Sequence, residues 1–281
     1  MDFTSVNSLI ARVEKSLKET GEFNRSEELL VGVDLGTAYI VLVVLDKEMN
    51  PIASEMQFAQ VLKDGLVVDY IGASRIVREL KGKLEKRLGV ELFKAAIAIP
   101  PGTGERDSKT HKYVVEGAGM EVTAILDEPT AANAVLGIEN GVIVDIGGGT
   151  TGLSILRNGK VVYTADEPTG GTHLSLVISG NYQITFEEAE KIKKDKNRQK
   201  EILTIVRPVV QKMAAIVKKH IEGYDVEDIY LVGGTCCLKG IEEVFEKETG
   251  IRTTKPKNPF LVTPLGIAMN CRIKGSDMNE Y

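Results

Sequence analysis

The chain has 281 residues, of which 43% are hydrophobic and 27% charged, so it can form two ordinary domains or one bilobal domain with a real core. Its formal net charge of −5 argues against a dedicated nucleic-acid binder, and no apolar run reaches the length of about 20 residues that a membrane-spanning helix needs. The N-terminus lacks the basic start and apolar core of a signal peptide. Three cysteines, two of them adjacent, form neither a disulfide framework nor a zinc site of usual spacing. We therefore expect a reduced, cytoplasmic protein.

Residues 2–20 predict a short amphipathic helix, and a polar linker follows it up to residue 28. Apolar residues recur here at the spacing of one helix face. They are Phe3, Val6, Ile10, Val13 and Leu17. Such a stripe can pack on the protein's own domain, or it can dock into the groove of a partner. The sequence leaves both alternatives open.

From residue 29 to residue 140 the sequence predicts a first α/β region. It begins with three strands joined by short turns, which is a β-meander. A later strand is wholly apolar, which indicates a buried central strand. The expected elements are strands at 29–34, 40–45 and 52–56, a helix at 73–88, a strand at 95–99, a helix at 105–118, a strand at 122–126 and a helix opened by Pro129 and Thr130.

A second region of the same kind is expected from residue 141 to residue 281. It again begins with three strands joined by tight turns, one of them the hairpin signal Asn158-Gly159. The last helix is expected to return to the first region. The predicted elements are strands at 142–146, 153–156 and 161–165, a helix after Gly170-Gly171, helices at 186–196 and 201–220, a strand at 229–232, and helices at 240–249 and 263–270.

The two regions begin with similar strings. Residues Val31–Thr37 parallel residues Val142–Gly148, since each string is an apolar strand, an aspartate, an apolar residue and a glycine. The order of the elements that follow is repeated as well. A period of about 110 residues is too long for a solenoid repeat, so the pattern predicts two related lobes.

The glycine-rich turns indicate phosphate binding. A glycine turn at the end of a strand lets backbone N–H groups point at phosphate oxygens, and an aspartate just before it suits Mg²⁺, which takes few protein carboxylates. One Asp-Leu-Gly-Thr turn alone would be an ordinary β-turn. A pair, the second of which carries residues Gly147–Thr151, favours a clamp that holds one triphosphate from both sides.

Two other phosphate motifs can be rejected. Residues Gly147–Gly152 match the dinucleotide pattern G-x-G-x-x-G, but a strand follows where that motif requires a helix. Ser108-Lys109-Thr110 lacks the glycine that a Walker A loop places before its lysine.

Several segments resemble the motifs of the superfamily of actin, sugar kinases and heat-shock chaperone ATPases. Lys63–Tyr70 is similar to a segment of MreB-type bacterial actins. The resemblance implies an α/β, actin-like ATPase (ribonuclease H-like) fold of two similar lobes with a nucleotide cleft between them. The two phosphate motifs, the connecting motif and the adenosine motif correspond to Val33–Tyr39, Asp145–Thr151, Leu126–Ala132 and Ile229–Thr235.

Within this superfamily the chain resembles the EutJ family of ethanolamine-utilisation proteins. The likeness lies in Asp127–Thr130, Val144–Gly152 and Ala165–Glu167 followed by Gly170-Gly171. It implies an ATP-binding, chaperone-like or assembly factor with low ATPase turnover, whose lobes close on ATP. Its implied partners are ethanolamine-pathway enzymes or the shell proteins of a bacterial microcompartment.

The resemblance also implies roles for individual residues. Asp34 and Asp145 would face Mg²⁺, and Glu128 would orient the water that attacks the γ-phosphate. The alternative for Glu128 is a strand-end residue bonded to the turn before Pro129, and the alternative for the helical pair Glu190 and Lys193 is a solvated salt pair. The implied phosphate contacts are Gly36, Thr37, Ala38, Gly148, Gly149 and Thr150, the ribose and base contacts are Glu190 and Lys193, and the adenosine contacts are Gly233 and Gly234.

Two departures from the chaperone ATPases argue against rapid hydrolysis. Those proteins carry an aspartate where this chain has Gly152, and Lys63 is a weak candidate for their catalytic lysine. No peptide-binding domain follows the second region in this sequence, so chaperone action of the DnaK kind is not expected.

Two other functions remain open. The first is a filament-forming or scaffold protein like MreB or FtsA, with the helix at residues 2–20 as its anchor. The second is a small-molecule kinase, which ranks last because the short lobes leave little room for a sugar pocket.

Overall fold

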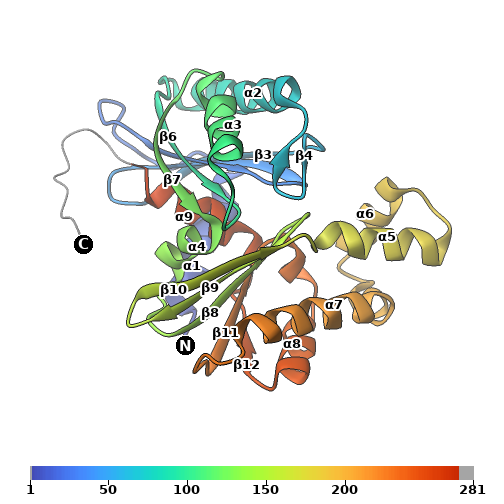
Figure 1. Cartoon of the computed structure of the whole chain (residues 1–281). Coiled ribbons are helices and arrows are strands. Elements are labelled where there is room, and N and C mark those ends of the chain that lie inside the picture. Colours follow the sequence, from blue (N-terminus) through green and yellow to red (C-terminus); the bar gives the residue numbers. More distant parts are fainter. Residues whose placement is uncertain (1, 272–281) are drawn as a thin grey trace. The chain divides into compact units, whose positions relative to one another are not determined.

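The computed structural model describes residues 2–271 of the chain and divides them into two compact units. Each unit contains a five-stranded sheet flanked by helices (Figure 1), which confirms the α/β class. Unit 1 comprises residues 2–99, 103–135 and 261–271, and unit 2 comprises residues 100–102 and 136–260.

The strands are close to those expected from the sequence. In unit 1 they are β1 (Leu30–Leu35), β2 (Tyr39–Leu45), β3 (Pro51–Phe58), β6 (Lys94–Ile99) and β7 (Glu121–Asp127), and in unit 2 they are β8 (Gly141–Ile146), β9 (Thr151–Arg157), β10 (Lys160–Glu167), β11 (Asp228–Val232) and β12 (Arg252–Thr254). A small separate hairpin is formed by β4 (Leu62–Lys63) and β5 (Leu66–Val67).

The two large sheets have the same topology. The order is β3-β2-β1-β6-β7 in unit 1 and β10-β9-β8-β11-β12 in unit 2. In each sheet the first three strands form an antiparallel meander, and two further strands extend it in parallel from the first strand. The repeat predicted from two short strings is therefore a repeat of whole sheets.

Helices cover both faces of the sheet in unit 1 (Figure 1). They are α1 (Thr4–Ser16), α2 (Tyr70–Leu88), α3 (Glu105–Glu116), α9 (Val262–Met269) and α4 (Glu128–Leu136), which ends at the boundary with unit 2. Side chains alternate along a strand, so Val33 of β1 lies in the core beneath α2 whereas Gly32 faces the opposite side. There α9 packs so closely that a Cβ atom at position 32 would lie 2.8 Å from the Cα of Ala268.

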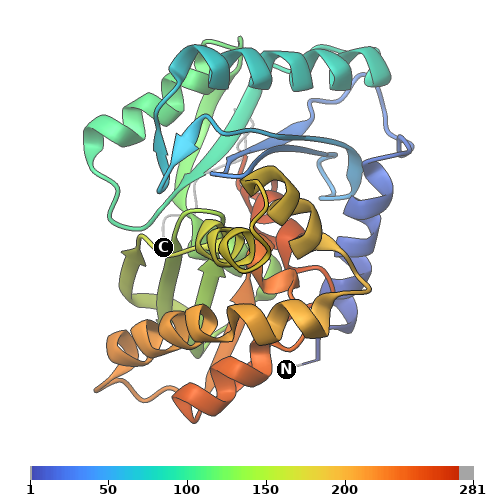
Figure 2. The ribbon, with the colours of Figure 1, turned by 90° about the vertical axis from the view of Figure 1, so that its right-hand side faces the viewer.

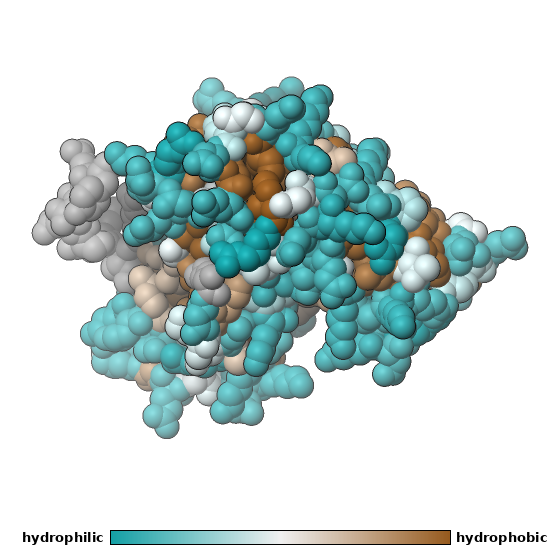
Figure 3. Space-filling view, turned by 90° about the horizontal axis from the view of Figure 1, so that it is seen from below, coloured by the Kyte–Doolittle hydropathy of each residue, from teal (hydrophilic) through white to brown (hydrophobic). Residues whose placement is uncertain are grey.

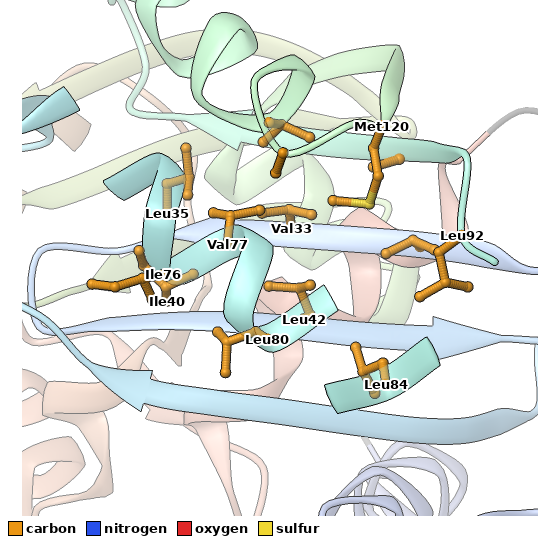
Figure 4. Close-up of a cluster of buried hydrophobic side chains, with 14 of the residues drawn as sticks. Val33, Leu35, Ile40, Leu42, Ile76, Val77, Leu80, Leu84, Leu92 and Met120 are labelled. Atoms are coloured by element: carbon orange, nitrogen blue, oxygen red, sulfur yellow. The ribbon is translucent and has the colours of Figure 1, made fainter. Parts of the chain in front are cut away.

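The core of unit 1 lies between α2 and the sheet (Figure 4). The helix begins earlier than expected because Asp69 caps it, accepting a hydrogen bond from the Gly72 amide at 2.9 Å. Val77, Leu80 and Leu84 follow on one helical face and are fully buried. Figure 4 shows these side chains directed at the apolar residues of β1 and β2.

Helix α1 packs on its own unit. Val6, Ile10 and Val13 of the predicted stripe are buried, and the helix contacts β3. At its end, Ser16 Oγ and Ser54 Oγ of β3 share a hydrogen bond of 2.7 Å. Of the two alternatives for this helix, the structure shows the intramolecular one.

Unit 2 is built from a sheet and four longer helices (Figure 2). They are α5 (Gly171–Tyr182), α6 (Phe186–Lys194), α7 (Gln199–Ile221) and α8 (Ile241–Thr249). Val142, Val144 and Ile146 of β8 share one core with α7 and α8, and α7 continues through Pro208. Because side chains alternate along β8, Asp145 is directed to the face opposite this core.

Among the described residues, no helix combines the length and apolarity needed to cross a lipid bilayer. On the face drawn in Figure 3, hydrophilic side chains predominate and hydrophobic ones gather in limited areas. This agrees with a charged fraction of 27%, since charged side chains mostly lie at protein surfaces.

Candidate functional site

Each unit carries a turn between its first two strands, and the two turns have the same hydrogen bond. In the first turn (residues 36–39) the Gly36 amide donates to the carbonyl of Tyr39 at 3.0 Å. In the second turn (residues 147–150) the Gly147 amide donates to the carbonyl of Thr150, also at 3.0 Å. An aspartate stands two residues before each of these glycines. The sequence repeat is thus a repeat of backbone geometry.

The first turn requires its glycine. A Cβ atom on Gly36 would lie 2.7 Å from the carbonyl oxygen of Tyr39, so a side chain would open the turn. Thr37 and Ala38 lie between Gly36 and Tyr39 in the chain and are half-buried. The hydroxyl of Thr37 accepts a long hydrogen bond of 3.4 Å from the Gly65 amide in the β4–β5 hairpin.

Two predicted residues lie at one edge of the unit 1 sheet. Strands β1, β6 and β7 are parallel neighbours, so their carboxyl ends meet at the same edge. Asp34 lies near the end of β1, and Glu128 follows β7 as the first residue of α4. The carboxylate of Asp127 caps that helix, accepting from the Thr130 amide at 2.9 Å and from the Thr130 hydroxyl at 2.7 Å. Asp127 thus supplies the N-terminal cap of α4.

The carbonyls of the second turn are held by distant residues. The Gly147 carbonyl accepts hydrogen bonds from the Gly171 amide at 2.9 Å and from the Thr235 hydroxyl at 2.7 Å. The Gly148 carbonyl accepts from the Thr172 amide at 2.8 Å. Both amide donors belong to the first turn of α5, so the second turn rests on the N-terminus of that helix.

This anchorage fixes where the amides of the second turn point. The N–H of Gly148 shares a peptide plane with the Gly147 carbonyl, and the two groups point in opposite directions. The same holds for the N–H of Gly149 and the Gly148 carbonyl. Both amides therefore point away from α5, and within residues 2–271 neither donates to a backbone carbonyl. Two outward amides in a glycine turn form a concavity suited to an anion.

The glycines of the predicted adenosine motif pack against the protein itself. Gly233 has a φ of 90°, and a Cβ atom there would lie 2.5 Å from the carbonyl oxygen of Ile146 and closer still to the Asp145 carboxylate. A Cβ atom on Gly234 would lie 3.2 Å from the ring of Phe260. These glycines thus allow β11 to approach the second turn closely, a role that the motif alone did not indicate.

The predicted pair on α6 is buried rather than solvated, so the solvated alternative was wrong. Glu190 is 6% exposed and forms ion pairs with Lys193 and Lys194. Lys193 also donates to the Gly171 carbonyl at 3.0 Å and to the Ser175 hydroxyl at 2.7 Å. Burial alone would raise the pKa of Glu190, but Lys193 and the hydrogen bonds outweigh it, so that pKa lies below its ordinary value. The pair joins α6 to the helix that holds the second turn.

Asp166 of β10 is a residue that the sequence analysis did not assign to the site. Its side chain is hydrogen-bonded by Thr150 of the second turn, and burial raises its pKa to about 7, with the charges of Asp145 and Glu167 acting in the same direction. Its Oδ1 atom is buried and has no hydrogen-bond partner among the described residues. The sequence signal that could have pointed to Asp166 is Gly152, which stands where the chaperone ATPases carry an aspartate.

The donor chemistry of these residues fits Mg²⁺ as it occurs beside nucleotides. The described residues contain no group of three or more His, Cys, Asp or Glu side chains placed to hold a metal. Mg²⁺ in nucleotide sites needs no such cage, because it takes one or two carboxylates and fills its shell with waters and phosphate oxygens. Unit 2 offers Asp145 near the end of β8, and unit 1 offers Asp34 near the end of β1.

Known proteins resemble this chain over most of its length. The family model described as Type IV pilus assembly protein PilM matches residues 110–275. The ethanolamine utilization protein EutJ of Escherichia coli K12 is 44% identical over 251 residues, which cover 89% of this chain and 88% of that protein. The chain belongs to the EutJ family. This confirms the family resemblance found in the sequence motifs.

Solved structures agree with this assignment. The crystal structure of EutJ from Carboxydothermus hydrogenoformans has a TM-score of 0.90 at 51% identity and covers 96% of this chain and 99% of its own. MreB 5 of Spiroplasma citri, bound to AMPPNP, has a TM-score of 0.71 at 18% identity and covers 86% of this chain and 95% of its own. A likeness at such low identity concerns the fold alone, and it confirms the actin-like ATPase fold.

Proposed function

We propose that this EutJ family member binds ATP with Mg²⁺ on its two turns and hydrolyses it slowly. The observation that carries the proposal is the duplicated turn, with the same 3.0 Å hydrogen bond in each unit and an aspartate two residues ahead of it. Such a turn once is common, whereas its repetition in two sheets of equal topology suits a ligand with several phosphates. One triphosphate that contacts both turns would couple the two units.

The residues of the two turns would divide the work of holding the phosphates. In unit 2, the outward amides of Gly148 and Gly149 would donate hydrogen bonds to phosphate oxygens, with Thr150 beside them. In unit 1, Gly36, Thr37 and Ala38 would do the same. A Mg²⁺ ion supplies neutralisation of the phosphate charge when it is bound.

The carboxylates near the turns would hold water. Asp34 and Asp145 would accept hydrogen bonds from waters around the metal. Glu128 would accept a hydrogen bond from the water that attacks the γ-phosphate and so orient it. Since Asp127 already fills the capping position of α4, the carboxylate of Glu128 is not needed for that purpose.

The nucleoside contacts would involve a rearrangement. Both carboxylate oxygens of Glu190 already have partners, namely Ser175 and Lys193 on one oxygen and Lys194 on the other. Contact of Glu190 or Lys193 with the ribose and base would therefore replace one of these bonds. Adenosine would lie against the backbone of Gly233 and Gly234. Their close contacts with Ile146, Asp145 and Phe260 limit the part of that backbone that a ligand can reach.

The cellular role we propose is a chaperone-like or assembly factor for ethanolamine utilisation. Its support is the likeness to the ethanolamine utilization protein EutJ of Escherichia coli K12, which is 44% identical over 89% of this chain. ATP would close the two units on each other and hydrolysis would release them, which would change a surface offered to pathway enzymes or to shell proteins of a microcompartment. The protein would carry out this role in the cytoplasm, in association with a microcompartment.

The filament or scaffold alternative gains nothing from α1. That alternative used the amphipathic helix as an anchor, but Val6, Ile10 and Val13 are buried within unit 1. Sedimentation of the protein with Mg-ATP over a range of concentrations separates the two functions. A filament former pellets above a critical concentration, whereas the proposed switch stays in the supernatant.

Calorimetry with Mg-ATP, together with measurement of phosphate release, tests the proposal. We expect binding by the parent and a loss of at least about tenfold in affinity for Asp145→Asn, since a hydrogen bond to a charged group contributes roughly 1.5–3 kcal/mol. Asp225→Ala, in which an exposed loop carboxylate of the same unit is removed, serves as the matched control and keeps the parent's affinity. A folded parent that binds no Mg-ATP would contradict the proposal.

Glu128→Gln separates binding from hydrolysis. The amide cannot take up a proton, so phosphate release should fall by about 100-fold or more, while Mg-ATP affinity stays within about twofold. Equal phosphate release by parent and variant would remove Glu128 from the reaction and leave the binding proposal intact.

A further inference from the structure

We infer that Asp166 is a positioning residue of the second phosphate turn, which it holds through the side chain of Thr150 from a neighbouring strand. The inference rests on the proposed ATP binding, and it assigns a function to a residue that lies in the family-like segment Ala165–Glu167 but received no role from it. Asp166 occupies the space left free by Gly152, the position at which the resembling chaperone ATPases carry their aspartate.

The strand register places the residues concerned side by side. Asp145 of β8 pairs with Gly152 of β9, and Gly152 pairs with Asp166 of β10. Residues directly opposite each other in an antiparallel pair project to the same face. The two carboxylates therefore project to one face of the sheet, the face opposite the core of α7 and α8, and only a glycine lies between them.

The missing side chain of Gly152 makes room for Asp166. A Cβ atom at position 152 would lie 3.4 Å from Asp166 Oδ1 and 3.1 Å from the ring of Pro101. An aspartate at that position would contact both Asp166 and Pro101 and would add a like charge beside Asp166. The chain carries its acid on β10 instead.

The contacts of Asp166 point to a role in the turn. Its carboxyl group is hydrogen-bonded by Thr150, which is 6% exposed and whose carbonyl closes the turn with Gly147. No Lys, Arg or His among the described residues forms an ion pair with Asp166, whereas its neighbour Glu167 pairs with His220 at 3.0 Å.

Asp166 is half-buried, and a carboxylate partly removed from water without a cation beside it is unfavourable for the fold. Its retention at this position is explained if it holds the hydroxyl of Thr150, and with it the outward direction of the turn amides, ready for a phosphate. Pre-organised donors of this kind strengthen binding because they need no rearrangement when the ligand arrives.

Calorimetry with Mg-ATP on four variants tests the inference. They are Asp166→Ala, Asp166→Asn, Thr150→Val and the double variant Asp166→Ala/Thr150→Val. Asp166→Ala should lose about tenfold in affinity, the scale of one hydrogen bond to a charged group. Asp166→Asn should stay within about threefold of the parent, because its amide oxygen can still accept from Thr150. Asp225→Ala is the control for loss of a carboxylate.

The double variant distinguishes positioning from a general structural role. If Asp166 acts through Thr150, the double variant binds no more weakly than Thr150→Val alone, so the two effects are not additive. Additive losses, or equal losses for Asp166→Asn and Asp166→Ala, would overturn the inference. If the parent binds Mg-ATP and Asp166→Ala binds it equally well, this inference is overturned and the proposed function stands. A folded parent that does not bind overturns the proposed function together with it.

Discussion

The two turns have the same backbone geometry but different anchorage. The first turn has two contacts with distant residues: the Ala38 carbonyl accepts from the Ala59 amide at 3.1 Å, and the Thr37 hydroxyl accepts from the Gly65 amide at 3.4 Å. The second turn is held by two amides of α5 and by the Thr235 hydroxyl, at 2.7 to 2.9 Å. Similar strings of residues can thus set the same shape of turn, whereas distant residues decide how firmly each turn is held. We expect the second turn to be the more rigid of the two.

The largest effect is expected at the glycine beneath the second turn. Gly233→Ala places a Cβ atom 2.5 Å from the Ile146 carbonyl oxygen at a φ of 90°, and it should lower the free energy of unfolding by about 4 kcal/mol. Gly250→Ala is the matched control, with a φ of 78° and open space around it, and should lose about 1 kcal/mol. Urea unfolding measures both, and equal losses would show that the contact beneath the turn is not tight.

The next effect concerns the buried ion pair on which α5 depends. The Lys193 and Glu190 side chains are 16% and 8% exposed, whereas those of Lys109 and Glu105 in unit 1 are 56% and 83% exposed. Lys193→Met leaves a buried carboxylate with one partner fewer and should lower the free energy of unfolding by about 3 kcal/mol. Lys109→Met should change it by about 0.3–0.5 kcal/mol. Urea unfolding of both variants checks the difference, which should vanish if the α6 pair is open to solvent.

Asp166 should make the free energy of unfolding depend on pH. Its pKa is about 7 in the folded chain against 3.8 for the ordinary group, so between these values the folded chain holds a proton that the unfolded chain has lost. The free energy of unfolding of the parent should therefore fall as the pH rises through this range. Asp166→Asn removes the fall, and at pH 8 it should be more stable than the parent by about 1–2 kcal/mol, after allowance for solvent screening of a partly exposed group. Unfolding curves at pH 5 and pH 8 measure the change, and a parallel pH response of both proteins would contradict it.

The smallest effect compares the two turns directly. Thr235→Val removes the 2.7 Å hydrogen bond to the Gly147 carbonyl and should lower the free energy of unfolding by about 1 kcal/mol. Thr37→Val removes a bond of 3.4 Å at the edge of hydrogen-bond geometry and should change it by less than about 0.5 kcal/mol. Hydrogen exchange sharpens the result, since only Thr235→Val should speed exchange of the Gly147 and Gly171 amides, which are hydrogen-bonded at the second turn.

The sequence predicted the fold well because its signals are local. Strand β6 was predicted by an apolar run, and the meanders by short turns between alternating residues. The equal order of the two sheets was anticipated from two strings of seven residues. Helix α1 was predicted too long, since residues 17–20 lie beyond its end at Ser16, and whether it packs on its own unit depended on β3, which no local pattern encodes.

The site was predicted less completely because its contacts are not local. Asp166 of β10 reaches Thr150, which lies just before the neighbouring strand β9, and Thr235 reaches the Gly147 carbonyl from a short 3₁₀ helix 88 residues away. The helical spacing of Glu190 and Lys193 placed them on one face of α6, but their burial depends on Ser175 and Gly171 of α5. Motifs locate the backbone of such a site, whereas strand register and helix packing supply its charges.

The close packing of α9 on β1 has a consequence for biosynthesis. A Cβ atom at Gly32 would lie 2.8 Å from the Cα of Ala268, so one face of the unit 1 sheet is covered by residues that follow the whole of unit 2 in the chain. Unit 2, apart from residues 100–102, is a continuous stretch of chain and can complete its core earlier. Contacts of long sequence separation form slowly. During translation, unit 1 should therefore begin to fold before unit 2 but complete its fold after it. Until α9 packs on β1, one apolar face of the unit 1 sheet stays exposed.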